Sequence, residues 1–450
     1  MSLLLPAVVT MALAPPALGA QGADDPGPRA DPEDAVYPLG SRVELFVDEH
    51  TIDTLEGLRL TLHHPRLAEV AVRRDRPYED STLYDPVVML DDGRYRMWYR
   101  TNFNSRPFYT GYAESPDGIR WTKPSLGIIE YQGSRDNNLV WSSEAAAGDP
   151  RVLAVFKDPR SERPPEQRYK AVCVVSRPAL AGLVSPDGLH WELVRDEPII
   201  TDGAFDSHNI AFYDAARGCY VAYYRDFTQG VRHIRRATSQ DFLSWQHEGF
   251  IDLGDAPLEH LYKNAATPYY RRPDLILMFP KRFLPERPAP AGWEHPGLSD
   301  IVFMSSRDGF HFDRTFMEAF IRPGRDPLNW HERAIEAGPG LVPTGDGQMS
   351  LYVVQNYRTD SVHIRRAVLR QDGIASLHAA MPGGEMTTRP FTFQGSELVI
   401  NYATSAGGGI QVELQDAEGR PLPGRELESC PPIYGDELAR VVAWESGSDV

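Results

Sequence analysis

Three acidic residues stand at equivalent places in successive units of this 450-residue chain, each close ahead of a strand-forming segment. Asp85 directly precedes the apolar segment 86–90, Asp206 shortly precedes 210–213, and Glu259 opens the next unit. Polar neighbours accompany the second and third acids: His208, Asn209, His260 and Asn264. Carboxylates gathered around one pocket suit cleavage of a glycosidic bond, because one acid must be ionised to activate water while another is protonated to serve the leaving oxygen. We therefore predict Asp85, Asp206 and Glu259 as catalytic residues.

Other polar residues lie close to the same predicted strands. Tyr84 and Arg282 lie beside predicted inner strands and are added to the substrate-binding candidates His208, Asn209, His260 and Asn264. Asp158 follows the apolar segment 152–156, so we predict a turn residue there. His63 and His64 are adjacent, and neighbouring side chains of a strand point to opposite faces, so they do not predict a metal site. The sequence indicates no metal and no cofactor.

A repeated pattern, Ser-x-Asp-Gly-x-x-aromatic, organises the chain. It occurs, with some variation, at 115–121, 185–191, 239–245 and 306–312, and a degraded copy lies at 370–373. The aspartates recur every 54 to 70 residues, which is the length of a four-stranded sheet. The Asp-Gly pair favours a tight turn, and the aromatic residue suits packing between sheets. Five copies predict an all-β, five-bladed β-propeller over residues 39–385, in which the turn aspartates are structural.

The ends of the chain differ from this pattern. Residues 1–20 are largely apolar and end in small residues, which predicts a signal peptide and export to the periplasm or the extracellular space. Residues 21–38 are rich in Gly, Pro and Asp and are expected to form a disordered linker. Short alternating strands over 386–450 predict a small β-sandwich, truncated by comparison with a full one.

The bulk composition limits the partners. A formal net charge of −17 argues against nucleic acid and against an anionic membrane surface, and it is compatible with an oligo- or polysaccharide. Three cysteines without a Cys-x-x-Cys pattern indicate buried free thiols. The chain has neither a dinucleotide-binding glycine motif after a strand nor a Gly-x-Ser-x-Gly elbow, so dinucleotide and serine-hydrolase readings lack support.

Over residues 40–380 the chain resembles the five-bladed propeller glycoside hydrolases, the arabinanase/xylosidase and β-fructosidase superfamily. Within it, the chain is most similar to exported planctomycete-type proteins that resemble β-fructosidase N-terminal domains. Tyr84-Asp85-Pro86-Val87 is similar to the first-blade Asp-Pro element, and the order Asp, Asp, Glu also matches. The resemblance implies Asp85 as base or nucleophile, Glu259 as acid, and Asp206 as a substrate contact that tunes the acid. The Trp-x-Asn-Asp-Pro and Glu-Cys elements are absent, and His260 follows Glu259.

The resemblance implies a hydrolase of furanosides or related sugars, and two alternatives stay open. A glycoside phosphorylase uses the same propeller with phosphate in place of water, and should line its channel with Arg, Lys or His. A carbohydrate-binding propeller without catalysis is the other alternative, because a fold does not determine a function.

Overall fold

The computed structural model describes residues 7–12, 36–145, 151–175, 179–381 and 383–450, and these form two units. The larger unit spans 64–370. The smaller unit combines both ends of the chain, 1–63 and 371–450. The strands are short and mostly antiparallel, and the only helices among the described residues are four 3-10 turns of three residues each. The protein is therefore all-β, as the sequence predicts.

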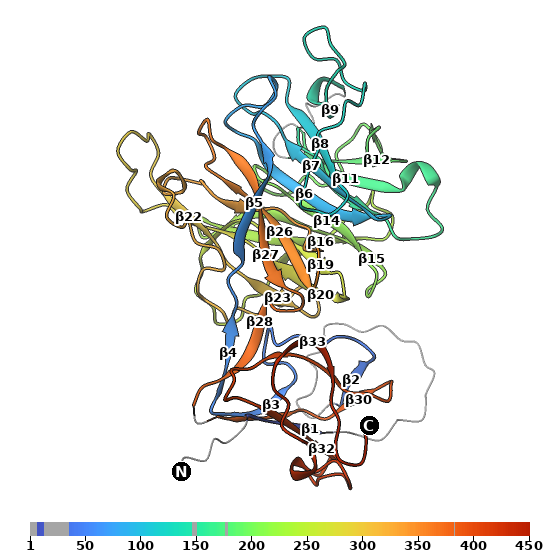
Figure 1. Ribbon diagram of the computed structural model, residues 1–450. Helices are drawn as coiled ribbons and strands as arrows, with labels where there is room; N and C mark the ends of the chain where they lie inside the picture. The colour runs from blue at the N-terminus through green and yellow to red at the C-terminus, as the bar shows by residue number, and fades with distance from the viewer. Residues whose placement is uncertain (1–6, 13–35, 146–150, 176–178, 382) are drawn as a thin grey trace. The chain divides into compact units, whose positions relative to one another are not determined.

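The larger unit begins with three four-stranded sheets, each formed by strands consecutive in sequence (Figure 1). The first contains β6 (Tyr84–Asp91), β7 (Arg94–Arg100), β8 (Tyr109–Ser115) and β9 (Leu139–Ser142). The second contains β10 (Ala154–Lys157), β11 (Tyr169–Val174), β12 (Leu180–Ser185) and β13 (Glu192–Leu193). The third contains β14 (Ile210–Asp214), β15 (Cys219–Thr228), β16 (Val231–Ser239) and β17 (Gln246–Phe250).

The rest of the larger unit is less regular. The fourth region is divided into β18 (His260–Lys263), β21 (Lys281–Leu284) and β22 (Leu298–Ile301), and β19 (Thr267–Tyr269), β20 (Arg272–Met278) and β23 (Met304–Ser306). The fifth sheet contains β24 (Glu336–Ala337), β26 (Gln348–Gln355), β27 (His363–Arg370) and β5 (Arg66–Arg73), with β25 (Val342–Pro343) also paired to β26. Strand β5 thus joins the start of this unit to its last sheet, beside β27 (Figure 1).

Neighbouring sheets contact one another, and each contact involves the first strand of at least one of the two sheets. Strand β6 contacts β10, β10 contacts β14, β16 contacts β18, β22 contacts β24, and β26 contacts β6. This succession of four-stranded antiparallel sheets is consistent with a propeller-like fold. The number of blades and their closure into a ring stay predictions.

The repeated Ser-x-Asp-Gly pattern forms the turn after the third strand of a sheet. In the first copy Ser115 Oγ accepts the amide of Gly118 at 2.9 Å, and Asp117 Oδ1 accepts the amides of Ile119 and Arg120 at 2.8 Å each. The glycine carbonyl then accepts a hydrogen bond from an aromatic side chain of the neighbouring sheet, such as the Tyr352 hydroxyl at 2.5 Å. The copies at Gly188 and Gly309 bind Trp98 and Tyr223 in the same way. The turn aspartates are therefore structural, as predicted.

Gly188 provides a test of this contact between sheets. Its φ is +77°, and an added Cβ would lie 2.9 Å from Trp98 Cζ2. We expect Gly188→Ala to lower the free energy of unfolding by about 2–4 kcal/mol, because left-handed strain and a core clash add together. Gly218 is the matched control, since its φ is +67° and nothing lies within 4 Å of its added Cβ. Urea unfolding should show a loss of only about 1 kcal/mol for Gly218→Ala, and equal losses would exclude the Trp98 contact as a cause.

The smaller unit pairs strands from the two ends of the chain. Strand β4 (Leu58–Leu62) is antiparallel to β28 (Ala375–Ala379), β3 (Ile52–Glu56) to β29 (Glu385–Thr388), and β31 (Val399–Ala403) to β33 (Asp436–Val441). Strand β2 (Tyr37–Gly40) is parallel to β30 (Phe391–Phe393), and β1 (Ala7–Ala12) is parallel to β32 (Ile410–Gln415) and β29. The boundaries predicted at 39 and 385 therefore differ from the structure, because 39–63 and 371–385 pair within this unit.

The predicted signal and linker fall mostly outside the described residues. Of 1–20 only β1 is described, and of 21–38 only 36–38. Export stays a prediction. Cys173, Cys219 and Cys430 are buried and free, as predicted.

Candidate functional site

Asp85 lies near the start of β6, where the pairing of β6 with β7 is irregular. Tyr84 pairs with Arg100 and Val87 with Trp98, so two residues of β6 oppose one of β7. Asp85 lies in this bulge with a φ of +52°. Bulges re-aim side chains beside active sites, and non-glycine residues held in the left-handed region cluster at functional sites. The local backbone thus marks Asp85 as a site residue.

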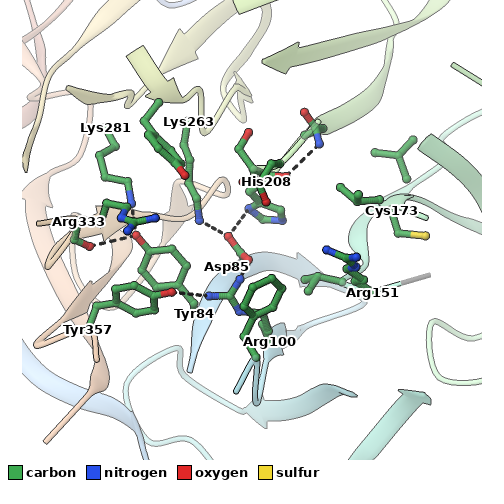
Figure 2. Close-up of a pocket in the computed structure, with 18 of the residues that line it drawn as sticks. Tyr84, Asp85, Arg100, Arg151, Cys173, His208, Lys263, Lys281, Arg333 and Tyr357 are labelled. Atoms are coloured by element: carbon green, nitrogen blue, oxygen red, sulfur yellow. Dashed lines mark hydrogen bonds and ion pairs between the residues drawn. The ribbon is translucent and has the colours of Figure 1, made fainter. Parts of the chain in front are cut away.

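Three basic side chains surround the Asp85 carboxylate, which is 6% exposed. Lys263 binds Oδ1, Arg100 lies 3.3 Å from Oδ2, and His208 Nδ1 lies 3.8 Å from Oδ1 (Figure 2). Lys263 stands at a second register shift, where β18 pairs with β21. The site is therefore built by two irregular strand pairings.

A second buried acid, Glu336, supports this group from β24. Its Oε1 accepts the amide of Asp85 at 3.0 Å, which stabilises the bulge. Its Oε2 contacts the ammonium of Lys263 and lies 3.2 Å from that of Lys281. Lys263 thus lies between two carboxylates that are almost fully buried.

Tyr84 connects the second lysine to the site. Its hydroxyl accepts a hydrogen bond from Lys281 and donates one to the Arg333 carbonyl at 3.2 Å. Its ring stacks on Tyr357 with centroids 4.1 Å apart, and Lys263 Nζ lies 3.7 Å from the ring centroid. Burial raises the pKa of Tyr84, as does the neighbouring Glu336, so this hydroxyl stays protonated.

These residues line a cavity of about 140 Å³, called here the Asp85 cavity. Its acidic lining residues are Asp85 and Asp206. Its basic residues are Arg100, Arg151, Lys263, Lys281, Arg333 and Arg358, with His208 beside them. Aromatic and apolar residues complete the wall: Tyr84, Phe103, Val152, Val172, Cys173, Val174, Tyr262 and Tyr357, together with Ser207 and Asn209. The cavity is therefore markedly basic in an acidic protein.

Three of the ten described non-glycine residues with a positive φ line this cavity. Asp85, Arg333 and Arg358 all line it, and their φ values are +52°, +58° and +64°. Each such non-glycine residue costs on the order of 1 kcal/mol. Three of them at one cavity indicate that the fold holds these side chains in place for binding or chemistry.

The pKa values of the ionisable groups in the cavity follow from their burial and from neighbouring charges. Burial alone would raise the pKa of Asp85, but Lys263, Arg100 and His208 outweigh it and hold that pKa well below its usual range. Burial lowers the pKa of His208 to about 4 and that of Lys281 to about 7. At neutral pH Asp85 is therefore an anion, His208 is neutral and Lys281 is near its midpoint.

The structure brings several predicted site residues to the Asp85 cavity. Tyr84, Asp85, Asp206, His208 and Asn209 all line it. Asn209 also fixes its own loop, because its side-chain amide donates to the carbonyls of Phe205 at 3.0 Å and Ser207 at 2.9 Å. The predicted grouping of β6 with the segment before β14 is thus observed.

Glu259 requires a correction, because it does not line this cavity. Its carboxylate binds Arg282 at 3.0 Å and Arg314 at 2.7 Å, and Arg282 also binds Asp300. These ion pairs hold Glu259 and Arg282 in a separate charged cluster. His260 Nδ1 accepts the amide of Arg232 at 3.2 Å, away from the lining. Asn264 is buried, and its amide donates to the Tyr223 carbonyl at 3.0 Å.

Most of the basic residues that line the Asp85 cavity were not predicted from the sequence. Arg100 ends β7 and Lys263 ends β18, and the register shifts that aim such residues have no sequence signature. Arg333 and Arg358 lie outside the regular strands and belong to no motif. Their signal, a positive φ at an arginine, exists only in the structure.

Two further features are absent from the described residues. None of their helices has the length and apolar character needed to cross a membrane. The described part of the chain also contains no group of three or more His, Cys, Asp or Glu arranged to hold a metal ion.

Comparison with known proteins gives limited sequence matches. No model of a protein family matches the chain. Two uncharacterized proteins of Mycobacterium tuberculosis, MT1551 and Rv1502, are each 29% identical to it over 135 residues. The match covers 28% of this chain and 40% of each relative. The chain thus spans about two fifths of the length of the curated relatives it matches.

Solved structures give a broader likeness. A thermostable family-43 glycoside hydrolase is 15% identical, with a TM-score of 0.44 over 68% of this chain and 96% of that one. A glycosyl hydrolase from Bacteroides ovatus is 14% identical, with a TM-score of 0.41 over 75% and 96%. An N-acetylgalactosamine deacetylase from F. plautii, in complex with blood group B trisaccharide, is 12% identical, with a TM-score of 0.45 over 70% and 96%. The chain is therefore structurally similar to glycoside hydrolases at low sequence identity, and this likeness by itself assigns neither activity nor substrate.

Proposed function

We propose that the protein cleaves a glycosidic bond in the Asp85 cavity. The observation that carries the proposal is a buried, ionised carboxylate on a strained bulge, with a second carboxyl group, Asp206, in the same cavity. Hydrolysis of glycosides uses two carboxyl groups on either side of the scissile bond. The site therefore supplies the two groups that this chemistry requires.

The environments of the two acids suggest their roles. Asp85, held as an anion by Lys263 and Arg100, either accepts the proton of the attacking water or attacks the anomeric carbon itself. Asp206 replaces Glu259 as the proposed acid, because it lines the cavity and Glu259 does not. It donates its proton to the leaving oxygen. His208 is neutral at pH 7 and contributes no competing charge.

Phosphorolysis is a second candidate, favoured by the six basic residues that line the cavity. In that reaction inorganic phosphate attacks the anomeric carbon, and arginine and lysine side chains bind its oxygens. Asp206 keeps the role of acid. The two reactions differ in whether turnover requires phosphate.

A glycoside screen with wild type, Asp206→Asn and Glu259→Gln tests this proposal. We expect wild type to cleave at least one aryl or oligosaccharide substrate without phosphate. Asp206→Asn should lose about 10²–10⁴-fold in kcat/KM on natural sugars and much less on aryl glycosides, since a good leaving group needs no proton. Binding without cleavage by wild type would identify a carbohydrate-binding protein. Turnover only with added phosphate would establish the phosphorylase.

A further inference from the structure

A second hollow lies on the larger unit, apart from the Asp85 cavity. Its volume is about 370 Å³, within the roughly 300–1,000 Å³ that is usual for small-molecule sites. We call it the Tyr109 hollow, and its lining includes Tyr78, Asn102, Ser105, Tyr109, Tyr131 and Gln132. None of the described residues that line it also lines the Asp85 cavity. The proposed chemistry therefore gives this hollow no role.

The loop between β7 and β8 contributes to both places. Asn102 lines the Tyr109 hollow, whereas the next residue, Phe103, lines the Asp85 cavity. The Asn102 amide donates to the carbonyls of Ser105 at 3.0 Å and Pro107 at 2.9 Å, and its oxygen accepts the amide of Tyr109 at 3.0 Å. These hydrogen bonds fix the loop, so this wall of the hollow is formed before a ligand arrives.

Three tyrosine rings form the apolar part of the wall. Tyr131 meets Tyr78 and Tyr109 edge to face, with centroids 5.4 Å and 5.8 Å away. The Tyr131 hydroxyl donates to the Pro77 carbonyl at 3.2 Å, and the Tyr78 hydroxyl donates to Asn138. The protein itself therefore holds two of the three rings in place through their hydroxyl groups.

The hydroxyl of Tyr109 differs from the other two. Tyr109 is 7% exposed, and no described residue shares a hydrogen bond with its hydroxyl. Burial raises the pKa of Tyr109, so the hydroxyl stays protonated and can both donate and accept. Buried polar side chains normally have a partner. An unpartnered hydroxyl at the wall of a hollow therefore points to a polar group of a ligand.

The charged residues of the hollow do not favour an ionic ligand. Asp80 and Arg106 both line it and carry opposite formal charges. The Asp80 carboxylate is occupied, because it accepts the amides of Thr82 at 2.6 Å, Phe103 at 3.1 Å and Asn104 at 2.9 Å. The ligand that fits this lining is therefore neutral.

The uncharged polar groups distinguish a sugar from a flat aromatic ligand. They are the hydroxyl of Tyr109, the hydroxyl of Ser105 and the exposed amide of Gln132. A sugar carries a hydroxyl on most of its carbons and presents C–H groups on the face of its ring. It can thus pair with all three groups while its face packs on a tyrosine ring. An aromatic ligand would leave these groups without partners.

We propose that the Tyr109 hollow is a second binding site, which takes a neutral saccharide. The sugar ring packs on Tyr131 and Tyr109, and its hydroxyl groups pair with Tyr109 and Gln132. No bond is made or broken there. The inference goes beyond the proposed function and does not depend on cleavage in the Asp85 cavity.

Calorimetric titration of the full chain with cellobiose, xylobiose, arabinobiose and galactobiose tests the proposal. We expect at least one of them to bind. Tyr109→Phe keeps the ring and removes one hydrogen bond, so it should weaken that binding about fivefold. Tyr131→Ala removes a packing surface and should weaken it about tenfold or more.

Gln132→Gly has a matched control elsewhere in the chain. Gln132-Gly133 and Gln229-Gly230 are the same dipeptide with nearly the same φ values, +49° and +82° against +50° and +78°. Gln229 lies in the turn between β15 and β16 and lines neither site. Glycine favours a positive φ, so neither substitution should lower the midpoint of urea unfolding. Gln132→Gly should weaken the disaccharide about fivefold, and Gln229→Gly should not change its affinity.

The outcomes separate this site from the proposed function. Binding of no disaccharide, or binding that Asp85→Asn abolishes and all three substitutions in the hollow leave unchanged, overturns the second site. Binding of 4-nitrophenol that Tyr131→Ala removes, without binding of any sugar, also overturns it and assigns the hollow to an aromatic ligand. Disaccharide binding that depends on Tyr109 and Gln132, without cleavage of any glycoside, supports the second site and contradicts the proposed function.

Discussion

Asp85→Asn should reduce kcat/KM for glycoside cleavage by about 10²–10⁴-fold, on natural sugars and aryl glycosides alike. The amide keeps the shape of the side chain and loses its charge. It can neither accept the proton of water nor attack the anomeric carbon. Steady-state kinetics on the substrate found in the screen would measure the effect, with the melting temperature as a check on folding.

Glu259→Gln is the informative control for this variant. Glu259 binds Arg282 and Arg314 outside the cavity, so the substitution should leave kcat/KM within a few-fold of wild type. It should cost about 3 kcal/mol of stability, because the Arg314 side chain is only 3% exposed and loses its carboxylate partner. A loss of activity in Glu259→Gln equal to that in Asp85→Asn would restore Glu259 as the acid. Full activity in Asp85→Asn would show that the reaction does not take place in the Asp85 cavity.

Lys263→Met should destabilise the protein by about 3–5 kcal/mol at neutral pH, because it leaves Asp85 and Glu336 as buried carboxylates without the cation between them. The defect should shrink as pH falls. In wild type the pKa of Asp85 lies below its unfolded value, so its stabilising contribution is present at neutral pH and is lost on acidification. In the variant the carboxyl is protonated at a higher pH, which relieves the buried charge.

Urea unfolding at neutral pH and near about pH 4 would measure this difference. Lys157→Met is the matched control, since Lys157 binds Asp91 and Asp92 but is 32% exposed. Its loss should be about 1 kcal/mol or less at both pH values. Equal losses for the two lysines would contradict the role of Lys263 as the shared cation.

The sequence predicted the elements that depend on local patterns. The Ser-x-Asp-Gly turns were recognised because Gly118 and its counterparts require a positive φ, and this requirement is visible in the residue type. Asp85 and Asp206 were identified because each lies directly or shortly before an apolar segment, 86–90 and 210–213, that is predicted to form a strand. Each of these features is encoded within a few residues.

The parts that were missed depend on contacts distant in sequence. Glu259 had the expected place before β18, but Arg282 and Arg314 hold it in another cluster. Lys281 and Glu336 meet Tyr84 across about 200 or more residues of chain, and no spacing rule predicts such a meeting. The smaller unit was assigned to 386–450 alone, because strand pairing between 52–62 and 375–388 has no local signal.

The pairing of β4 with β28 has a consequence for how the chain is organised. Leu62 lies opposite Ala375, so the chain leaves the smaller unit and returns to it through adjacent strands. The larger unit, 64–370, is in topological terms an insertion between two neighbouring strands of its host. Strands β3 and β4 are made early but meet their partners only after more than three hundred residues have been synthesised. All strands of the larger unit are therefore synthesised before the smaller unit can assemble. Strands β3 and β4, which are made before the larger unit, pair with their partners only after it.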